Sequence, residues 1–411
     1  SLEDTDEDGA PTYSERAMNR FSQELARAEK EYAAFLDDHA RVHAAAGAVP
    51  TAQAIQRRLA SDQGLVEYVV GPENVIVFVL TSRAMEVKSL PLHEPDVAAR
   101  IELLRDLIRR PGDDHWRKPA ARLSAELLDP IERSGWLEGV TRLYLVPHGV
   151  LTYVPFALLP RSTARDSDLL VDRYTIAYLP AAAALLRASA GVDRKQSLLA
   201  VAPSRGGLRH APEEARAIDA LFRPNARTLI GSEATESRFK SMAGEFRMLH
   251  LATHGYFNRS SPLLSGLELE AGEGEDGMLR VHEILDLPLQ ANLVTLSACD
   301  TALGSGYFAD TPAGDEFLAL NRAFLAAGSA SVMATLWQVD DRASVSLMKQ
   351  FYGRLRTSVD GGNAANALAL AQRSLRRSPQ LGHPYYWAAY VVIGDGASQT
   401  GVVRKSDGRT S

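Results

Sequence analysis

The stretch NLVTLSACDTALG, residues 292–304, ends an apolar run with Cys299, the only cysteine of the 411-residue chain. The run NLVTLSA is apolar and partly β-branched, which predicts a buried strand. A second stretch, RMLHLATHGYF at 247–257, has the same form, because an apolar strand breaks off just before His254 and Gly255. In open α/β sheets, functional sites lie beyond the carboxyl ends of the strands. We therefore expect His254 and Cys299 to face one crevice if the two strands are neighbours.

These two residue types fit nucleophilic catalysis. A cysteine attacks a carbonyl carbon as its thiolate, and a histidine can take up the thiol proton and later protonate the leaving amine. For the tetrahedral intermediate we expect an oxyanion hole made by the backbone N–H groups of Gly255 and Cys299. His254 precedes Cys299 by 45 residues, near the spacing of about 50 in caspases. The alternative, a buried filler cysteine and a structural histidine, stays open.

Composition limits the class of protein. With 45% hydrophobic and 23% charged residues and a net charge of −6, the chain is an ordinary globular protein without the basic surface of a nucleic-acid binder. A single cysteine forms no internal disulfide, so we expect a reducing compartment, the cytoplasm. No apolar run approaches the ~20 residues of a membrane span. The acidic start is unlike a signal peptide, and the missing initiator Met is consistent with a fragment of a longer protein.

The order of the expected elements indicates an α/β fold. Short apolar strands alternate with helices, which predicts a mostly parallel central sheet with helices on both faces. Apolar residues at three- and four-residue steps predict an amphipathic helix within 13–48. The expected organisation is a disordered start and helical segment at 1–58, a first lobe at 59–190, a second lobe at 195–396 and a disordered tail at 397–411.

The two lobes echo one another. RLYLVPHGVL at 142–151 is similar to RMLHLATHGYF, and YTIAYLPAAAALL at 174–186 is similar to VTLSACDTALG. Each pair places a strand, a His-Gly dipeptide, then a later strand and a small-residue turn. The first lobe keeps His148 but has Pro180 and Ala181 where the second has its cysteine. Duplication and chance both explain two such short similarities.

Together with GDEFLALNRAFLAAGSASVMATLWQVDD (314–341) and HPYYWAAYVVIGD (383–395), these segments resemble the CHAT family. This is a family of caspase-like cysteine peptidases, related to separase and often fused to tetratricopeptide repeats. The resemblance covers roughly residues 50–396. It implies a caspase-like three-layer sandwich with a degenerate first lobe and an active second lobe, after a short N-terminal helical segment. It also places the family's catalytic dyad on His254 and Cys299.

The resemblance implies a cysteine endopeptidase that cuts a protein partner and is regulated by an upstream domain or an activating protein. Bacterial members often serve in defence. We expect no cofactor, no metal and no direct contact with nucleic acid or membrane; EAGEGEDG at 270–277 lacks the ligand spacing of a calcium loop. A catalytically silent interaction module is the alternative, and the intact dyad argues against it. A glutaminase-type acyl transferase ranks last, because the histidine precedes the cysteine.

ATLWQVDD at 334–341 resembles the separase segment that lines the pocket for the residue before the scissile bond. By that similarity Asp340 favours Arg or Lys there through a charge-assisted pair. The alternative is that Asp340 caps the following helix. Trp337 either walls this pocket or belongs to the core, and Asp300 either steadies the turn or contacts the substrate. These alternatives stay open.

Overall fold

The computed structural model divides the chain into two units, residues 1–51 and 52–411. In the first unit, the structure describes the paired strands β1 (Asp4–Thr5) and β2 (Pro11–Thr12) and residues 50 and 51. The described residues then run over 50–161, 168–186, 196–205, 208–256, 258, 261–297, 315–357 and 363–395. The predicted helix at 13–48, the tail at 397–411, Cys299 and Asp300 lie outside them.

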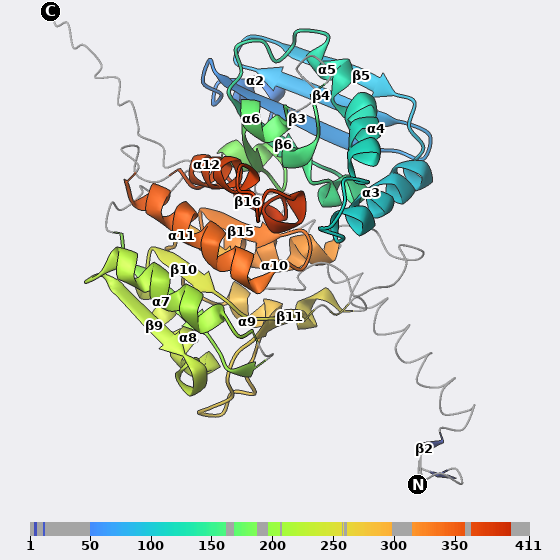
Figure 1. Ribbon diagram of the computed structural model, residues 1–411. Coiled ribbons are helices and arrows are strands. Elements are labelled where there is room, and N and C mark those ends of the chain that lie inside the picture. Colours follow the sequence, from blue (N-terminus) through green and yellow to red (C-terminus); the bar gives the residue numbers. More distant parts are fainter. Residues whose placement is uncertain are drawn as a thin grey trace, which may run out of the picture. The chain divides into compact units, whose positions relative to one another are not determined.

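Among the described residues, the second unit is built on one 11-stranded sheet with the order β5-β4-β3-β6-β7-β16-β15-β14-β10-β8-β9 (Figure 1). Neighbouring strands are parallel except in the pairs β3–β4, β4–β5 and β15–β16. The predicted α/β class with a mostly parallel central sheet is confirmed. The strands are β3 (Gln63–Val70), β4 (Val75–Thr81), β5 (Met85–Leu90), β6 (Arg142–Val146), β7 (Thr175–Tyr178), β8 (Leu198–Ala202), β9 (Ala226–Ile230), β10 (Met248–Leu251), β14 (Leu293–Leu296), β15 (Ser331–Thr335) and β16 (Tyr390–Gly394).

Helices cover this sheet, and Figure 1 shows α7, α11 and α12 side by side in front of its second half. Helix α12 contacts both β7 and β16, so it joins the two halves. Its first turn is capped by Asn363, whose side chain accepts from the backbone N–H of Asn366. The helices are α2 (Ala52–Gln56), α3 (Glu94–Ile108), α4 (Arg117–Leu127), α5 (Asp129–Glu132), α6 (Leu170–Arg173), α7 (Ala211–Phe222), α8 (Glu236–Met242), α9 (Val281–Leu285), α10 (Asp315–Ala326), α11 (Asp341–Thr357) and α12 (Ala364–Arg376).

Two details differ from the expectation. The alanine-rich composition of residues 181–188 predicts a helix, but residues 182–186 form a 3-10 turn, η3 (Ala182–Leu186), which is one of several such short turns. A second sheet of three antiparallel strands, β11 (Gly255–Tyr256), β12 (Gly266–Glu268) and β13 (Met278–Arg280), was not predicted. Strands of two or three residues are too short to show a period in the sequence.

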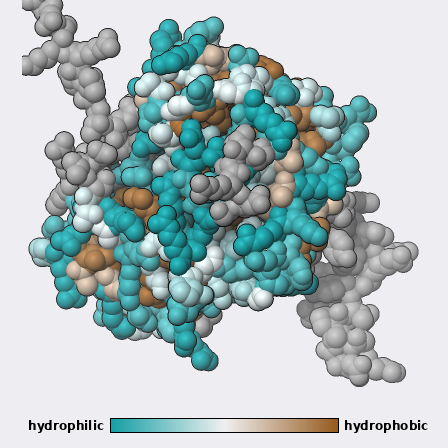
Figure 2. Space-filling view, turned by 45° about the horizontal axis from the view of Figure 1, so that its top comes forward, coloured by the Kyte–Doolittle hydropathy of each residue, from teal (hydrophilic) through white to brown (hydrophobic). Residues whose placement is uncertain are grey.

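The core explains why the long strands could be found. Every residue of β8, β10, β14, β15 and β16 is buried. Parallel strands covered on both faces give such continuous apolar runs rather than an alternating pattern. The face in Figure 2 is largely hydrophilic, with hydrophobic residues in small separate patches. None of the described helices combines the length and apolar character that crossing a bilayer demands.

A polar network lies inside this core, between strands β10 and β14 and the helices α7 and α11 that cover them. His250 on β10 has its Nε2 atom 2.9 Å from Oε1 of Glu214 on α7. Its Nδ1 atom is 3.2 Å from the hydroxyl of Tyr352 on α11, and that hydroxyl donates to Oγ1 of Thr295 on β14 at 2.8 Å. All four side chains are buried. The network therefore ties β10 to β14 and both strands to the helices above them.

Replacing Tyr352 with Phe should lower the free energy of unfolding by about 1–3 kcal/mol, because it leaves buried polar groups of His250 and Thr295 without a partner. Urea denaturation of the two proteins measures the difference. Tyr386→Phe is the matched control, since the hydroxyl of Tyr386 has no hydrogen-bond partner in the described part of the chain. Equal losses in both variants would contradict the role given to this network.

Candidate active site

The site is organised by the pairing of β10 with β14. The two strands are parallel neighbours, which meets the condition that the sequence left open, and their register pairs Met248 with Leu293 and Leu251 with Leu296. Paired residues are thus 45 positions apart in the chain. His254 follows Leu251 by three residues, and Cys299 follows Leu296 by three residues. The spacing of the predicted dyad equals the register of the strands that precede it.

The backbone around His254 is held by the small sheet. The carbonyl oxygen of His254 accepts from the N–H of Glu268 at 2.9 Å, and the hydroxyl of Thr253 donates to the carbonyl oxygen of Glu268. The His254 side chain is half-buried. Strand β11 begins at the next residue, Gly255, so the histidine sits where the central sheet passes into the small one.

The N–H of Gly255 points away from β12. In an antiparallel pair, hydrogen-bonded and non-hydrogen-bonded residue pairs alternate. His254 and Glu268 form a hydrogen-bonded pair, so the next pair, Gly255 with Leu267, is not hydrogen-bonded. Strand β11 is the outer strand of its sheet. The amide of Gly255 is therefore available on the outer side of β11 for a group other than β12.

The first half of the sheet has a similar pair of parallel strands but no cysteine. Strands β6 and β7 are parallel neighbours whose register pairs Leu145 with Tyr178, an offset of 33 positions. Counting from His148 by the same offset leads to Ala181, whose methyl group cannot act as a nucleophile. The Nδ1 atom of His148 accepts from the backbone N–H of Val70 at 3.2 Å. Here the histidine supports the neighbouring strand β3.

Two of the three expected pocket residues, Trp337 and Asp340, lie on the segment between β15 and α11, and the third, Asp300, lies outside the described residues. Asp340 occupies the N-cap of α11, where its Oδ1 atom accepts from the N–H of Ala343 at 2.9 Å. The neighbouring Asp341 accepts from the N–H of His210 at 2.8 Å. Trp337 is 1% exposed and donates its indole N–H to the carbonyl oxygen of Tyr385 at 3.2 Å. Trp337 is thus packed in the core, whereas Asp340 is partly exposed and keeps its Oδ2 atom clear of the capping bond.

Sequence reasoning missed Arg105, which reaches the same segment from helix α3. Its Nη2 atom donates to the carbonyl oxygen of Leu336 at 2.8 Å, and its guanidinium carbon lies 4.9 Å from the centre of the Tyr153 ring. The side chain is buried, and this burial lowers the pKa of Arg105 to about 10. The available signal was an arginine on the apolar stripe of α3, between Ile101 and Ile108.

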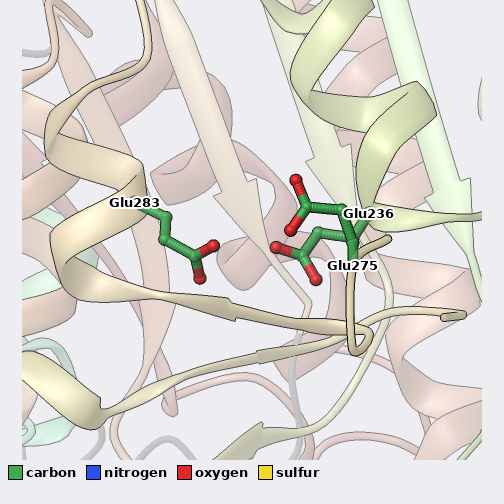
Figure 3. A group of neighbouring side chains, drawn as sticks. All are labelled: Glu236, Glu275 and Glu283. Atoms are coloured by element: carbon green, nitrogen blue, oxygen red, sulfur yellow. The ribbon is translucent and has the colours of Figure 1, made fainter. Parts of the chain in front are cut away.

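Three carboxylates face one another beside the small sheet, from Glu236 on α8, Glu275 in the loop before β13 and Glu283 on α9 (Figure 3). The Nζ atom of Lys240 lies 2.6, 3.0 and 2.6 Å from them. Partial burial alone would lower the pKa of Lys240, but its hydrogen bonds to the carboxylates raise it above the ordinary value. Burial raises the pKa of Glu236. The ammonium group supplies the positive charge that this cluster needs.

Replacing Lys240 with Met should lower the free energy of unfolding at pH 7 by about 3 kcal/mol, because three carboxylates then face one another without the ammonium group that they share. Carboxyl groups whose pKa is raised in the folded state bind more protons there than in the unfolded state. The deficit should therefore shrink as the pH falls from about 7 to about 5. Urea denaturation at both pH values measures this.

The matched control is Lys349→Met, which removes an exposed lysine 3.5 Å from Glu213 and should cost less than about 1 kcal/mol. A loss in Lys240→Met that does not depend on pH would contradict the electrostatic explanation.

Known proteins share this sequence and architecture. Two curated proteins named tetratricopeptide repeat protein 28, from Mus musculus and from Homo sapiens, are each 28% identical to the chain over 336 residues. These alignments cover 67% of this chain but 13% of the relatives, so the chain spans a small part of their length.

Among solved structures, separase in the Saccharomyces cerevisiae separase–securin complex matches with a TM-score of 0.57 at 10% identity, over 84% of this chain and 30% of that chain. This likeness shows the shared caspase-like fold. The sequence pattern of the CHAT domain matches residues 117–395, which is more than half of the chain. The resemblance to the CHAT family is thereby confirmed, and the chain belongs to the CHAT domain family.

Proposed function

We propose that this chain is a caspase-like cysteine endopeptidase with Cys299 as nucleophile and His254 as its proton carrier. The observation that carries the proposal is the register of β10 and β14. Both residues follow a paired strand end by the same three positions, at the carboxyl edge where α/β proteins hold their sites. Membership of the CHAT domain family and the caspase-like fold support it.

The reaction proceeds by acyl transfer. The sulfur of Cys299 attacks the scissile carbonyl carbon while His254 holds the thiol proton. The tetrahedral intermediate collapses to a thioester, and His254 delivers the proton to the leaving amine. Water then hydrolyses the thioester and restores the thiol. The backbone N–H groups of Gly255 and Cys299 stabilise the negatively charged oxygen in both steps, and the outward direction of the Gly255 amide supports this role.

We propose that only the second lobe is catalytic. Residues 195–396 form the peptidase lobe and 59–190 the degenerate lobe, in which Ala181 stands at the position that corresponds to Cys299. The substrate is a protein, and an upstream domain or a separate activating protein regulates the cut. The length of the curated relatives, of which the chain spans 13%, supports control by a further part of a longer chain.

The dyad can be tested without knowing the substrate, because the chain has one thiol. Iodoacetamide should alkylate Cys299 at about pH 6.5 at least about tenfold faster in the parent than in His254→Ala, since a paired thiolate persists below the ordinary thiol pKa of about 8.5. Intact-protein mass spectrometry follows the single added label. Cleavage of a peptide library should vanish in both Cys299→Ala and His254→Ala.

The control is His115→Ala, which removes an exposed histidine, its side chain 77% accessible, and should alkylate as the parent does. If the alkylation rate depends on pH in the same way in the parent and in His254→Ala, His254 does not activate Cys299 and the proposed dyad is excluded. The silent interaction module would then be the better description of this chain.

Asp340 is proposed to select a basic residue before the scissile bond. Its Oδ1 atom caps α11, and its second oxygen is free to accept a charge-assisted hydrogen bond from Arg or Lys. The two roles that the sequence left open are thus compatible in one carboxylate. Asp300 and Trp337 complete the predicted pocket: Asp300 as a substrate contact beside the nucleophile, and Trp337 as a packed support under the segment that carries Asp340.

Asn is as good an N-cap as Asp but carries no charge, so Asp340→Asn separates specificity from capping. This variant should keep the stability of the parent and lose about 10- to 100-fold in kcat/KM for substrates with Arg or Lys before the cut. Peptide pairs that differ only in Arg or Gln at that position measure the preference. Asp341→Asn, the neighbouring control, should change it less than about threefold; an unchanged preference in Asp340→Asn would exclude the selecting role.

A further inference from the structure

The outer edge of β5 is an exposed strand edge. β5 is the last strand of the 11-stranded sheet, with no strand beyond it among the described residues. Met85 is 42% exposed and Val87 is 51% exposed. Val87 lies opposite Phe78 of β4, and both share one face of the sheet with Met85. Proteins commonly protect such an edge with charged side chains, proline, a bulge or a cover. Strand β5 contains no proline, and its two charged residues, Glu86 and Lys88, have opposite signs.

The hairpin fixes which backbone groups of β5 face outward. Thr81 donates its N–H to the carbonyl oxygen of Ala84 at 2.9 Å, so these two residues form a hydrogen-bonded pair. Because bonded and non-bonded pairs alternate, Glu86, Lys88 and Leu90 hydrogen-bond with β4. The backbone N–H and C=O groups of the intervening Met85, Val87 and Ser89 therefore point away from the sheet.

This edge is complementary to itself. A second β5 strand laid antiparallel, with Val87 opposite Val87 of the other copy, places Met85 opposite Ser89. Each of these is an outward-facing residue, so all three pairs exchange backbone hydrogen bonds, about six in total. The pairs between them are non-bonded, with closer side chains, and there Glu86 meets Lys88 twice, once on each side of the axis.

We propose that two copies of this chain form a symmetric dimer through β5, with the two central sheets joined into one. The self-complementary charges select a second copy over other partners, because the pattern Glu-Val-Lys satisfies itself only about a twofold axis at Val87. The exposed side chain of Val87 then packs against Val87 of the other copy, and the exposed Met85 lies on the same face, diagonal to that Val87. The opposite edge of the sheet, β9, carries the exposed Arg227 and has no such pattern.

Sedimentation equilibrium of the full chain at about 1–100 μM tests the dimer. The parent should dimerise, and Glu86→Lys and Lys88→Glu should each raise the dimer dissociation constant by about tenfold or more, since like charges then meet on both sides of the axis. The double variant Glu86→Lys/Lys88→Glu should restore the parent value, because it exchanges the charges without changing the pairing. Glu73→Lys, the same charge change in the exposed turn between β3 and β4, should have no effect.

Val87→Pro provides an independent test. It removes an N–H that β4 does not use, so the fold should persist, as thermal unfolding will show, while dimerisation weakens by about a hundredfold or more. A parent that stays monomeric at 100 μM overturns the proposal. A dimer that persists in both Glu86→Lys and Val87→Pro also overturns it, since that dimer must form elsewhere. The same holds if the double variant Glu86→Lys/Lys88→Glu does not recover the dissociation constant of the parent.

Discussion

The register between β10 and β14 is the constraint on which the rest of the site depends. Parallel strands need a long crossover, and here the chain between them builds β11, β12, β13 and α9 before it returns. That crossover holds the carbonyl of His254 through Glu268. A slip by one residue would turn every buried side chain of β14 to the opposite face and set the two strand ends out of step. The buried contacts of His250, Tyr352 and Thr295 resist such a slip from within.

The two halves of the chain share one sheet. β16, the last strand among the described residues, lies between β7 of the first half and β15 of the second, and it is parallel to β7 and antiparallel to β15. Helix α12 covers this junction, and Arg105 of the first half donates to Leu336 of the second. The first half of the chain therefore supports the segment that leads to Asp340. Within that half, His148 has a structural role, because its side chain accepts from the backbone N–H of Val70 on β3.

The sequence allowed most of the central sheet to be predicted, because its buried strands are continuous apolar runs with clear ends. It also indicated that the strands before His254 and Cys299 end at candidate functional residues, whereas their pairing came from the structure. The small sheet could not be predicted, because its strands have only two or three residues and pair with strands distant in the chain. The role of Arg105 could not be predicted for a related reason. A charged residue on an apolar stripe can be assigned a role only once its partner is known, and that partner, Leu336, is 231 positions away. The carboxylate of Asp340 could be assigned a cap or a pocket from its sequence context, and the structure adds that the cap uses one oxygen.

The hydrogen bond between Arg105 and Leu336 bears on where the chain can be truncated without losing its fold. The segment that matches the family begins at residue 117, after β3, β4, β5 and α3. A piece starting there would leave β6 as a bare edge and deprive the buried carbonyl of Leu336 of its donor. The backbone groups of β6 and Leu336 would then have only water in place of the strand and the side chain that hold them. We therefore expect a stably folded piece of this chain to begin ahead of β3, before the boundary that sequence similarity draws.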